Sequence, residues 1–264
     1  MEATLHNIPI IRGILSRTNL RAKKMGIVAL MKSVVGIARS RIAIIMPKNT
    51  DKVLGEEPVL VISNHPAESD VPLLLSALKE REDTFLVASH QFLKILPEVD
   101  KNIIPVYINH RAWEINDLRL KIFCKFHSAK VFDREKSQQK NRESIALAAR
   151  KIDQGGVVVI YPAAEELNNQ FRNGVGFLLK NLKEKKKVKV VMAYIEGTSG
   201  WDYLRLIPFM GKLLPRIRIN FSRAFRADQV IGNDGKITTK NLEKRFYDLG
   251  IECRHTWEGH FRNQ

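Results

Sequence analysis

The sequence predicts an α/β fold, in which a mixed, largely parallel β-sheet is flanked by helices and preceded by an N-terminal basic amphipathic helical segment. Short apolar runs rich in β-branched residues alternate with longer segments of helical periodicity, as expected when crossover helices cover a sheet. The chain has 264 residues, of which 44% are hydrophobic, enough for one substantial core. Positive charge is concentrated ahead of the first apolar run.

The N-terminal segment carries that charge. Residues 1–48 contain nine Lys or Arg and a single acid, Glu2. Apolar residues recur at helical spacing over residues 25–45, which predicts a basic helix lying in a membrane interface near anionic headgroups. The alternative is a helix that packs on the domain and exposes its charges to water. The longest apolar stretch, residues 25–31, is far shorter than the roughly 20 residues that span a bilayer, so no transmembrane helix is predicted.

We therefore expect residues 1–50 to form membrane-interface helices, residues 47–57 to act as a linker, and residues 51–264 to form the α/β domain, with residues 226–264 as its helical extension. Strands are predicted where apolar, β-branched runs lie between turn-forming residues, and helices where apolar residues recur every three or four positions. The predicted strands are 58–63, 85–89, 103–108, 129–132, 157–161, 188–194 and 217–221, and the predicted helices are 71–79, 112–126, 139–154, 175–185 and 239–249.

A histidine and a carboxylate follow the first predicted strand. The run Val-Leu-Val-Ile-Ser at 59–63 stops at Asn64-His65-Pro66, and Asp70 comes five positions after His65. Ligands commonly bind at the carboxyl ends of strands in open α/β sheets. A carboxylate beside an imidazole fixes its tautomer and stabilises the imidazolium that forms when the ring takes a proton. A lone histidine at a strand end is often structural, but this combination favours a general base.

Four segments together resemble the lysophospholipid acyltransferases, the 1-acylglycerol-3-phosphate acyltransferase superfamily. Asn64-His65-x-x-x-x-Asp70 is similar to the first motif of that family, and residues 130–134, Lys-Val-Phe-Asp-Arg, are similar to its second. Residues 157–162, Val-Val-Val-Ile-Tyr-Pro, resemble the start of the third motif, and residues 171–177 the basic, glycine-bearing segment after it. The resemblance covers about residues 51 to 225.

This resemblance implies an O-acyltransferase of phospholipid biosynthesis. The enzyme would move a fatty acyl group from acyl-CoA or acyl carrier protein to the hydroxyl of a lysophosphatidate-like lysophospholipid, without a covalent acyl-enzyme. His65 and Asp70 would be catalytic, and four further residues would bind substrate: Asn64, Arg134, Glu165 and Arg172. Neither a metal nor another cofactor is implied. A guanidinium at a strand end suits bidentate capture of a phosphate, although Arg134 could instead pair with Asp133 or Glu135.

The third motif departs from the family pattern. The family reads Pro-Glu-Gly, whereas Pro162 is followed here by Ala163 and Ala164. Glu165 or Glu166 could substitute for the missing carboxylate through a two-residue slip. The alternative is a lipid-binding relative that has lost transferase activity.

The net charge of +16 implies anionic partners: phospholipid headgroups, an acidic carrier protein or nucleic acid. No nucleic-acid-binding motif, nucleophile elbow, phosphate loop, dinucleotide fingerprint or zinc-protease motif is present. We expect a cytoplasmic protein bound peripherally to an anionic phospholipid membrane, with no nucleic-acid partner. A basic nucleic-acid-binding module is the less favoured alternative.

Overall fold

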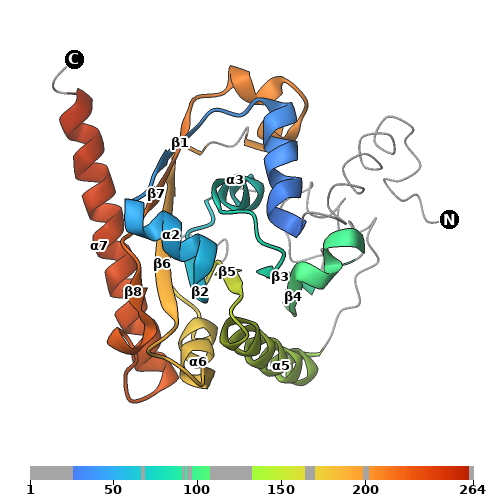
Figure 1. Cartoon of the computed structure of the whole chain (residues 1–264), viewed down its shortest axis with the longest axis vertical. Coiled ribbons are helices and arrows are strands. Elements are labelled where there is room, and N and C mark those ends of the chain that lie inside the picture. Colours follow the sequence, from blue (N-terminus) through green and yellow to red (C-terminus); the bar gives the residue numbers. More distant parts are fainter. Residues whose placement is uncertain are drawn as a thin grey trace.

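The structure, a computed structural model, describes residues 26–66, 69–90, 93, 97–107, 133–163, 170–198 and 202–261. Its centre is an eight-stranded sheet in the order β1-β7-β6-β2-β5-β3-β4, with β8 paired to β6 (Figure 1). The strands are β1 (Ile42–Ile45), β2 (Val59–Ser63), β3 (Thr84–Ser89), β4 (Ile103–Val106), β5 (Val157–Ile160), β6 (Lys189–Glu196), β7 (Ile217–Phe221) and β8 (Phe225–Arg226).

Most strand pairs are parallel. β2 pairs in parallel with both β5 and β6, β3 with β4 and β5, and β1 with β7. β6 pairs antiparallel with β7 and β8. Every residue of β2 is buried, as expected for a central strand covered on both faces. The predicted fold class, a mixed and largely parallel sheet flanked by helices, is confirmed.

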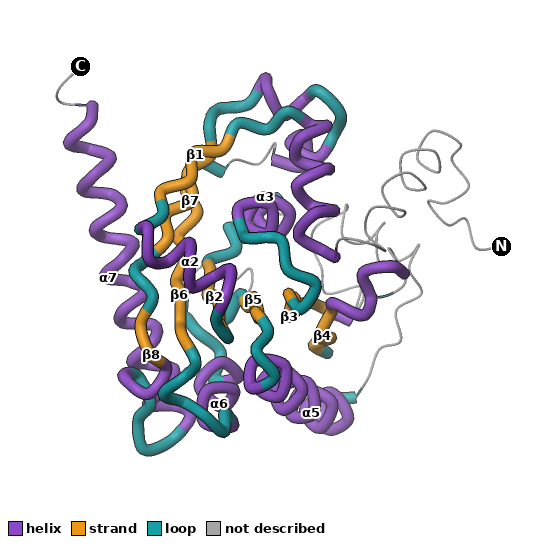
Figure 2. The backbone as a smooth tube through the Cα atoms, in the orientation of Figure 1, coloured by secondary structure: helices purple, strands orange, loops and turns teal. Residues whose placement is uncertain are grey.

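Two hydrophobic cores lie on opposite faces of the sheet. Val59 and Val61 of β2 face one core, whereas Leu60 and Ile62 face the other, because side chains alternate along a strand. The first core is covered by residues 26–38, which are helical, by α2 (Lys48–Glu56) and by α3 (Asp70–Ala77). The second is covered by α5 (Arg134–Asp153), α6 (Gly174–Asn181) and α7 (Gly235–Phe261). Figure 2 shows α5, α6 and α7 along one side of the strand row and α3 on the other.

The segment before β2 differs from the prediction. Helix 26–38 buries Ile27, Val28 and Leu30 in the first core, so its apolar side contacts the protein, which is the alternative that the sequence left open. Residues 42–45 form strand β1 instead of continuing the helix, because they pair with β7. The predicted linker at 47–57 is largely helix α2. The part of the membrane-interface prediction that concerns residues 1–25 lies outside the described residues.

Two helices are longer than predicted. α5 begins at Arg134 because the carboxylate of Asp133 accepts a hydrogen bond from the backbone N–H of Lys136 (2.8 Å) and caps the helix. α7 extends to Phe261, beyond the predicted end at residue 249. The predicted strand 129–132 and helix 112–126 lie outside the described residues. Among the described residues, no helix combines the length and apolar character needed to cross a bilayer.

The guanidinium of Arg81 binds the three loops that lead into β2, β3 and β5, at the end of the sheet where these parallel strands begin. Arg81 donates to both carboxylate oxygens of Asp83 (2.8 and 2.7 Å) and to the carbonyls of Glu57 (2.8 Å) and Gly155 (2.6 Å). These partners lie just before β3, β2 and β5. The hydrogen bonds from Arg81 lower the pKa of Asp83 below its ordinary value of 3.8. Arg81 therefore stabilises the register of the central strands.

We expect Arg81→Met to lower the free energy of unfolding by about 2–3 kcal/mol, because charge-assisted bonds are lost and backbone carbonyls lose their donor. Urea denaturation measures the change. The matched control is Lys52→Met, which removes an exposed pair with Glu56 and should change stability by less than about 0.5 kcal/mol. Because the folded pKa of Asp83 is depressed, its contribution is present above pH 3.8 and is lost as the pH falls below that value. Equal losses in both variants would contradict the role assigned to Arg81.

Candidate active site

The candidate site lies where the parallel strands β2 to β6 end, here called the C-terminal edge. Directly after β2, the side chain of Asn64 donates to the carbonyl of Ile195 (2.9 Å) and accepts from its backbone N–H (2.8 Å). The amide thus continues the β2–β6 ladder one step past the last paired residue, Ser63. This contact fixes the position from which His65 projects. The predicted substrate contact of Asn64 stays a prediction.

The structure brings His65 and Asp70 together. Asp70 is the first residue of α3 and is fully buried, and its Oδ2 lies 3.5 Å from Nδ1 of His65. This distance exceeds that of a good hydrogen bond, but catalytic contacts often tighten when substrate binds. Nδ1 of His65 is buried although the side chain is 20% exposed, so solvent reaches the ring from another side. Nδ1 faces the carboxylate, and Nε2 is the nitrogen that can meet a substrate.

Tyr161, directly after β5, completes the surroundings of this pair. Its ring centroid lies 4.9 Å from that of His65, at 41° between the ring planes. The hydroxyl is buried and has no hydrogen-bond partner in the part of the chain that the structure describes. Burial, and secondarily the negative charge of Asp70, raise the pKa of Tyr161 well above its ordinary value of 10.0, so the phenol stays neutral. The sequence indicated this residue only as part of a motif.

Two further rings follow the next strands of the same edge. His90 comes directly after β3 and Tyr107 directly after β4, and their ring centroids are 4.9 Å apart and nearly parallel, at 21°. The backbone N–H and carbonyl of Tyr107 bond to the side chain of Asn141 on α5 (2.7 and 3.0 Å). Four neighbouring strands, β2, β5, β3 and β4, are therefore each followed by an imidazole or phenol ring. His90 and Tyr107 were not predicted as site residues from the sequence.

The predicted phosphate ligands lie on the surrounding elements. Arg134 is the exposed first residue of α5, about 10 Å along the helix from Asn141, which contacts the end of β4. Asp133 pairs with Lys136 (3.1 Å), so that carboxylate is neutralised by a residue other than Arg134. Arg172 is exposed, and its backbone N–H donates to the carbonyl of Pro162 (2.9 Å), beside the third motif. Glu165 lies outside the described residues.

A buried ion pair connects the turn before α3 to the segment after β6. Ser69 donates to one carboxylate oxygen of Asp202 (3.3 Å), and the other lies 3.2 Å from Nε of Arg205, with both charged side chains fully buried. Arg205 also donates to the carbonyl of Pro215 (2.8 Å). The sequence carried no signal for this pair, because it lies on a short 3₁₀ helix, η4 (Asp202–Leu206), without periodicity.

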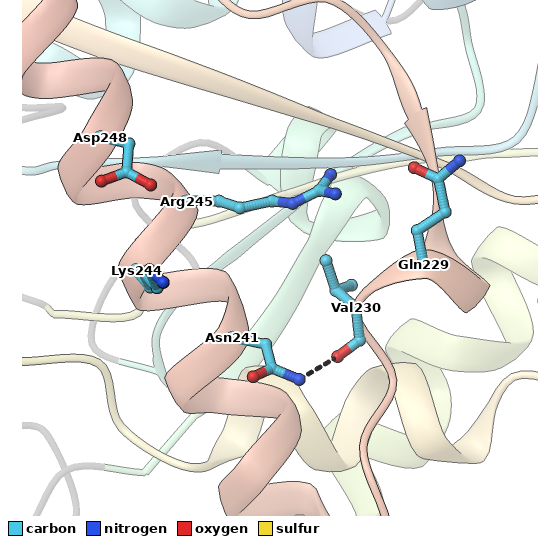
Figure 3. Close-up of a pocket in the computed structure, with 6 residues that line it drawn as sticks. All are labelled: Gln229, Val230, Asn241, Lys244, Arg245 and Asp248. Atoms are coloured by element: carbon cyan, nitrogen blue, oxygen red, sulfur yellow. Dashed lines mark hydrogen bonds between the residues drawn. The ribbon is translucent and has the colours of Figure 1, made fainter.

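A polar hollow of about 430 Å³ lies elsewhere, between α7 and the 3₁₀ helix η6 (Ala227–Gln229) (Figure 3). It is lined by Gln229, Val230, Asn241, Lys244, Arg245 and Asp248. Helix η6 follows β8, which pairs with the first residues of β6, so the hollow is near the end of the sheet opposite His65. No group of three or more His, Cys, Asp or Glu among the described residues is arranged to hold a metal ion.

The buried hydroxyl of Tyr161 can be tested by pH. We expect Tyr161→Phe to keep or raise the free energy of unfolding, within about 1 kcal/mol, because an unbonded buried hydroxyl is removed. Because the folded pKa is raised, the wild-type protein should lose stability relative to Tyr161→Phe as the pH rises above 10.0, where the unfolded tyrosine ionises. Denaturant unfolding of both proteins between pH 8 and about 11 measures the difference. A pH-independent difference would show that the phenol is not desolvated.

The chain is similar to one protein family and to a solved structure. The family model described as Acyltransferase matches residues 42–209, more than half of the chain, including His65 and Asp70. Among solved structures, the chain is similar to the 1-acyl-sn-glycerophosphate (LPA) acyltransferase PlsC from Thermotoga maritima, with 13% identity, a TM-score of 0.48, and coverage of 92% of this chain and 88% of that chain. The comparison with curated proteins gives no match. The family match, which contains the histidine and carboxylate found together at the sheet edge, shows that this chain belongs to the acyltransferase family.

Proposed function

We propose that this protein transfers a fatty acyl group from an acyl thioester to the free hydroxyl of a lysophospholipid, with His65 as general base. The observation that carries the proposal is the contact between Nδ1 of His65 and the fully buried carboxylate of Asp70, at 3.5 Å. The family match to the same region supports acyl transfer as the chemistry.

The reaction follows from the orientation of the imidazole. Nε2 of His65 takes the proton of the acceptor hydroxyl while its oxygen attacks the thioester carbonyl. The tetrahedral intermediate collapses with cleavage of the carbon–sulfur bond, and the leaving thiolate receives the proton from the imidazolium. The products are the ester and the free thiol, and no acyl-enzyme forms.

Asp70 assists the proposed action of His65 as a general base. A fully buried carboxylate is costly unless a positive charge compensates it, so the imidazolium that forms during attack is stabilised by Asp70. The N-terminus of α3 stabilises the carboxylate in turn, since the helix dipole is positive there. General base catalysis of this kind contributes about 10²–10⁴-fold.

The acceptor would be lysophosphatidate-like, held through its phosphate by Arg134, with a second contact from Arg172. Both are exposed guanidinium groups, and guanidinium binds phosphate oxygens in bidentate geometry. The net charge of +16 favours anionic substrates, including acyl-CoA or acyl carrier protein as donor. In this proposal the protein acts in phospholipid biosynthesis, on the cytoplasmic side of an anionic membrane to which it binds peripherally.

One observation favours a second candidate, a lipid-binding relative without turnover. Ala163 is 3% exposed, so a buried methyl group stands where the family motif has a carboxylate. Incubation with labelled acyl thioester and a panel of lysophospholipids separates the candidates. Binding of a lysophospholipid without product on any acceptor would support the inactive relative.

We expect His65→Ala to lower the rate of acyl transfer by at least about 10²-fold and Asp70→Asn to lower it by about 10²–10⁴-fold, because base and orienting carboxylate act together. Product formation from labelled acyl-CoA and lysophosphatidate measures both. The control is Lys244→Ala in the polar hollow, which should retain wild-type rates. Circular dichroism verifies that each variant is folded. Retained turnover in His65→Ala would overturn the proposed mechanism.

We expect Arg134→Ala to raise KM for lysophosphatidate about 10- to 100-fold with a smaller change in kcat, because one charge-assisted phosphate contact is lost. KM for a monoacylglycerol, which lacks the phosphate, should not change. Lys136→Ala is the matched control, since it removes a neighbouring cation that pairs with Asp133. An equal rise in KM for both acceptors would contradict a phosphate contact.

A further inference from the structure

Exposed apolar side chains gather where two distant segments lie side by side. Residues 36–41, at the end of helix 26–38, contact residues 207–216 after β6: the N–H of Phe209 donates to the carbonyl of Ile37 (3.1 Å), and Arg41 donates to the carbonyl of Leu214 (2.8 Å). The apolar residues exposed there are Ile37 (43%), Ile207 (42%), Phe209 (55%) and Leu213 (66%). We call these four residues, with the basic residues named next, the 209 patch.

The charges of the 209 patch have one sign. Arg39, Arg41, Lys212 and Arg216 are exposed in the two segments, and neither segment contains an Asp or Glu. The guanidinium of Arg39 lies over the ring of Phe209, 4.9 Å from its centroid. Apolar side chains among basic ones are typical of surfaces that enter the headgroup region of an anionic bilayer. The charge complementarity favours lipid over an apolar protein partner.

The backbone of the patch is held in an unfavourable conformation. Arg39 (φ 55°) and Phe209 (φ 64°) are the non-glycine residues with positive φ among the described residues. Arg39 ends helix 26–38 in a Schellman motif, in which its N–H bonds to the carbonyl of Gly36 and that of Ser40 to the carbonyl of Val35. Glycine usually occupies such positions, and other residues there cost about 1–2 kcal/mol each. Strain of this kind is found at functional sites.

The surrounding contacts hold this strained turn in place. A Cβ atom on Gly211 would collide with Ser40 and with the carbonyl of Ala38, so the segment after Phe209 packs closely on the end of helix 26–38. Ser40 donates to the carbonyl of Arg205 (2.8 Å). The ring of Phe209 nevertheless stays more than half exposed, so the turn presents it to the surroundings of the protein.

The patch and the candidate site occupy the same end of the sheet. The 3₁₀ helices η4 and η5 (Met210–Leu213) follow the end of β6, which runs parallel to β2, and Figure 1 shows this segment beside the end of helix 26–38. The buried pair of Asp202 and Arg205 joins Ser69, next to Asp70, to Pro215 in the patch segment. A surface that docks on the 209 patch is therefore rigidly placed relative to His65.

We infer that the 209 patch docks on an anionic phospholipid membrane, with Phe209 and Leu213 inserted among the lipids and the four basic residues on the headgroups. The role of this docking rests on the proposed function, because a docked protein could take a lysophospholipid from the bilayer to His65. It assigns membrane contact to residues other than Ile27, Val28 and Leu30, which helix 26–38 buries in the first core. The contact itself is independent of turnover.

The test is flotation with vesicles of phosphatidylcholine containing about 30% phosphatidylglycerol, without acyl donor. The variant Phe209→Gly/Leu213→Ser should bind at least tenfold more weakly, because two apolar side chains no longer leave water. Glycine adopts φ 64° without strain, so this variant should melt at or above the wild-type temperature, which separates lost binding from misfolding. Lys212→Gln/Arg216→Gln should weaken binding about fivefold per charge.

The matched control is Ile237→Ser/Tyr247→Ser, which removes an exposed aliphatic and an exposed aromatic side chain of α7 and should bind like the wild type. Three results would overturn the inference: no wild-type binding, equal binding by the patch variant, or equal loss in the control. A patch variant that floats normally but changes from dimer to monomer would identify the patch as an interface between copies. If flotation behaves as expected but no acceptor yields product, the proposed function fails and the membrane contact stands.

Discussion

The candidate site depends on the point at which β2 stops pairing with its neighbours. The Asn64 side chain bonds to both the N–H and the carbonyl of Ile195, so these backbone groups of β6 are paired where β2 ends, and α3 then begins at Asp70. His65 and Asp70 lie on either side of this turn, and β5 on the other flank delivers Tyr161 against the imidazole. The chemistry of the site thus follows from a parallel register that brings several strand ends to one edge.

The sequence was informative where local pattern and tertiary environment agree. Central strands such as β2 and β5 are buried on both faces, so they read as continuous apolar runs, and the Asn-His-x-x-x-x-Asp spacing marked the site. The prediction for the segment before β2 was wrong in part. Apolar residues at helical spacing indicated one helix over residues 25–45, but this stretch forms helix 26–38 and then strand β1. Only the pairing of β1 with β7, 175 residues later in the chain, decides which part is strand.

The remaining contacts of the site could not be read locally. Tyr161, His90 and Tyr107 are neighbours because of the strand order β2-β5-β3-β4, and strand order is a property of the folded sheet. The pair of Asp202 and Arg205 joins loops that are distant in sequence, and exposed apolar residues such as Phe209 stand out only when burial is known. The positive charge of residues 1–48 was visible in the sequence, but which side of helix 26–38 faces solvent was not.

The hydrogen bonds of Arg81 affect which parts of this enzyme can change in evolution without loss of the fold. It ties β2, β3 and β5 together where they begin, whereas the imidazole and phenol rings of the site lie where the strands end. Substitutions in the loops that follow the strands therefore leave the hydrogen bonds of Arg81 intact. Sequence changes at the C-terminal edge can therefore alter which substrates the acyltransferase accepts, while the opposite edge of the sheet keeps its structure.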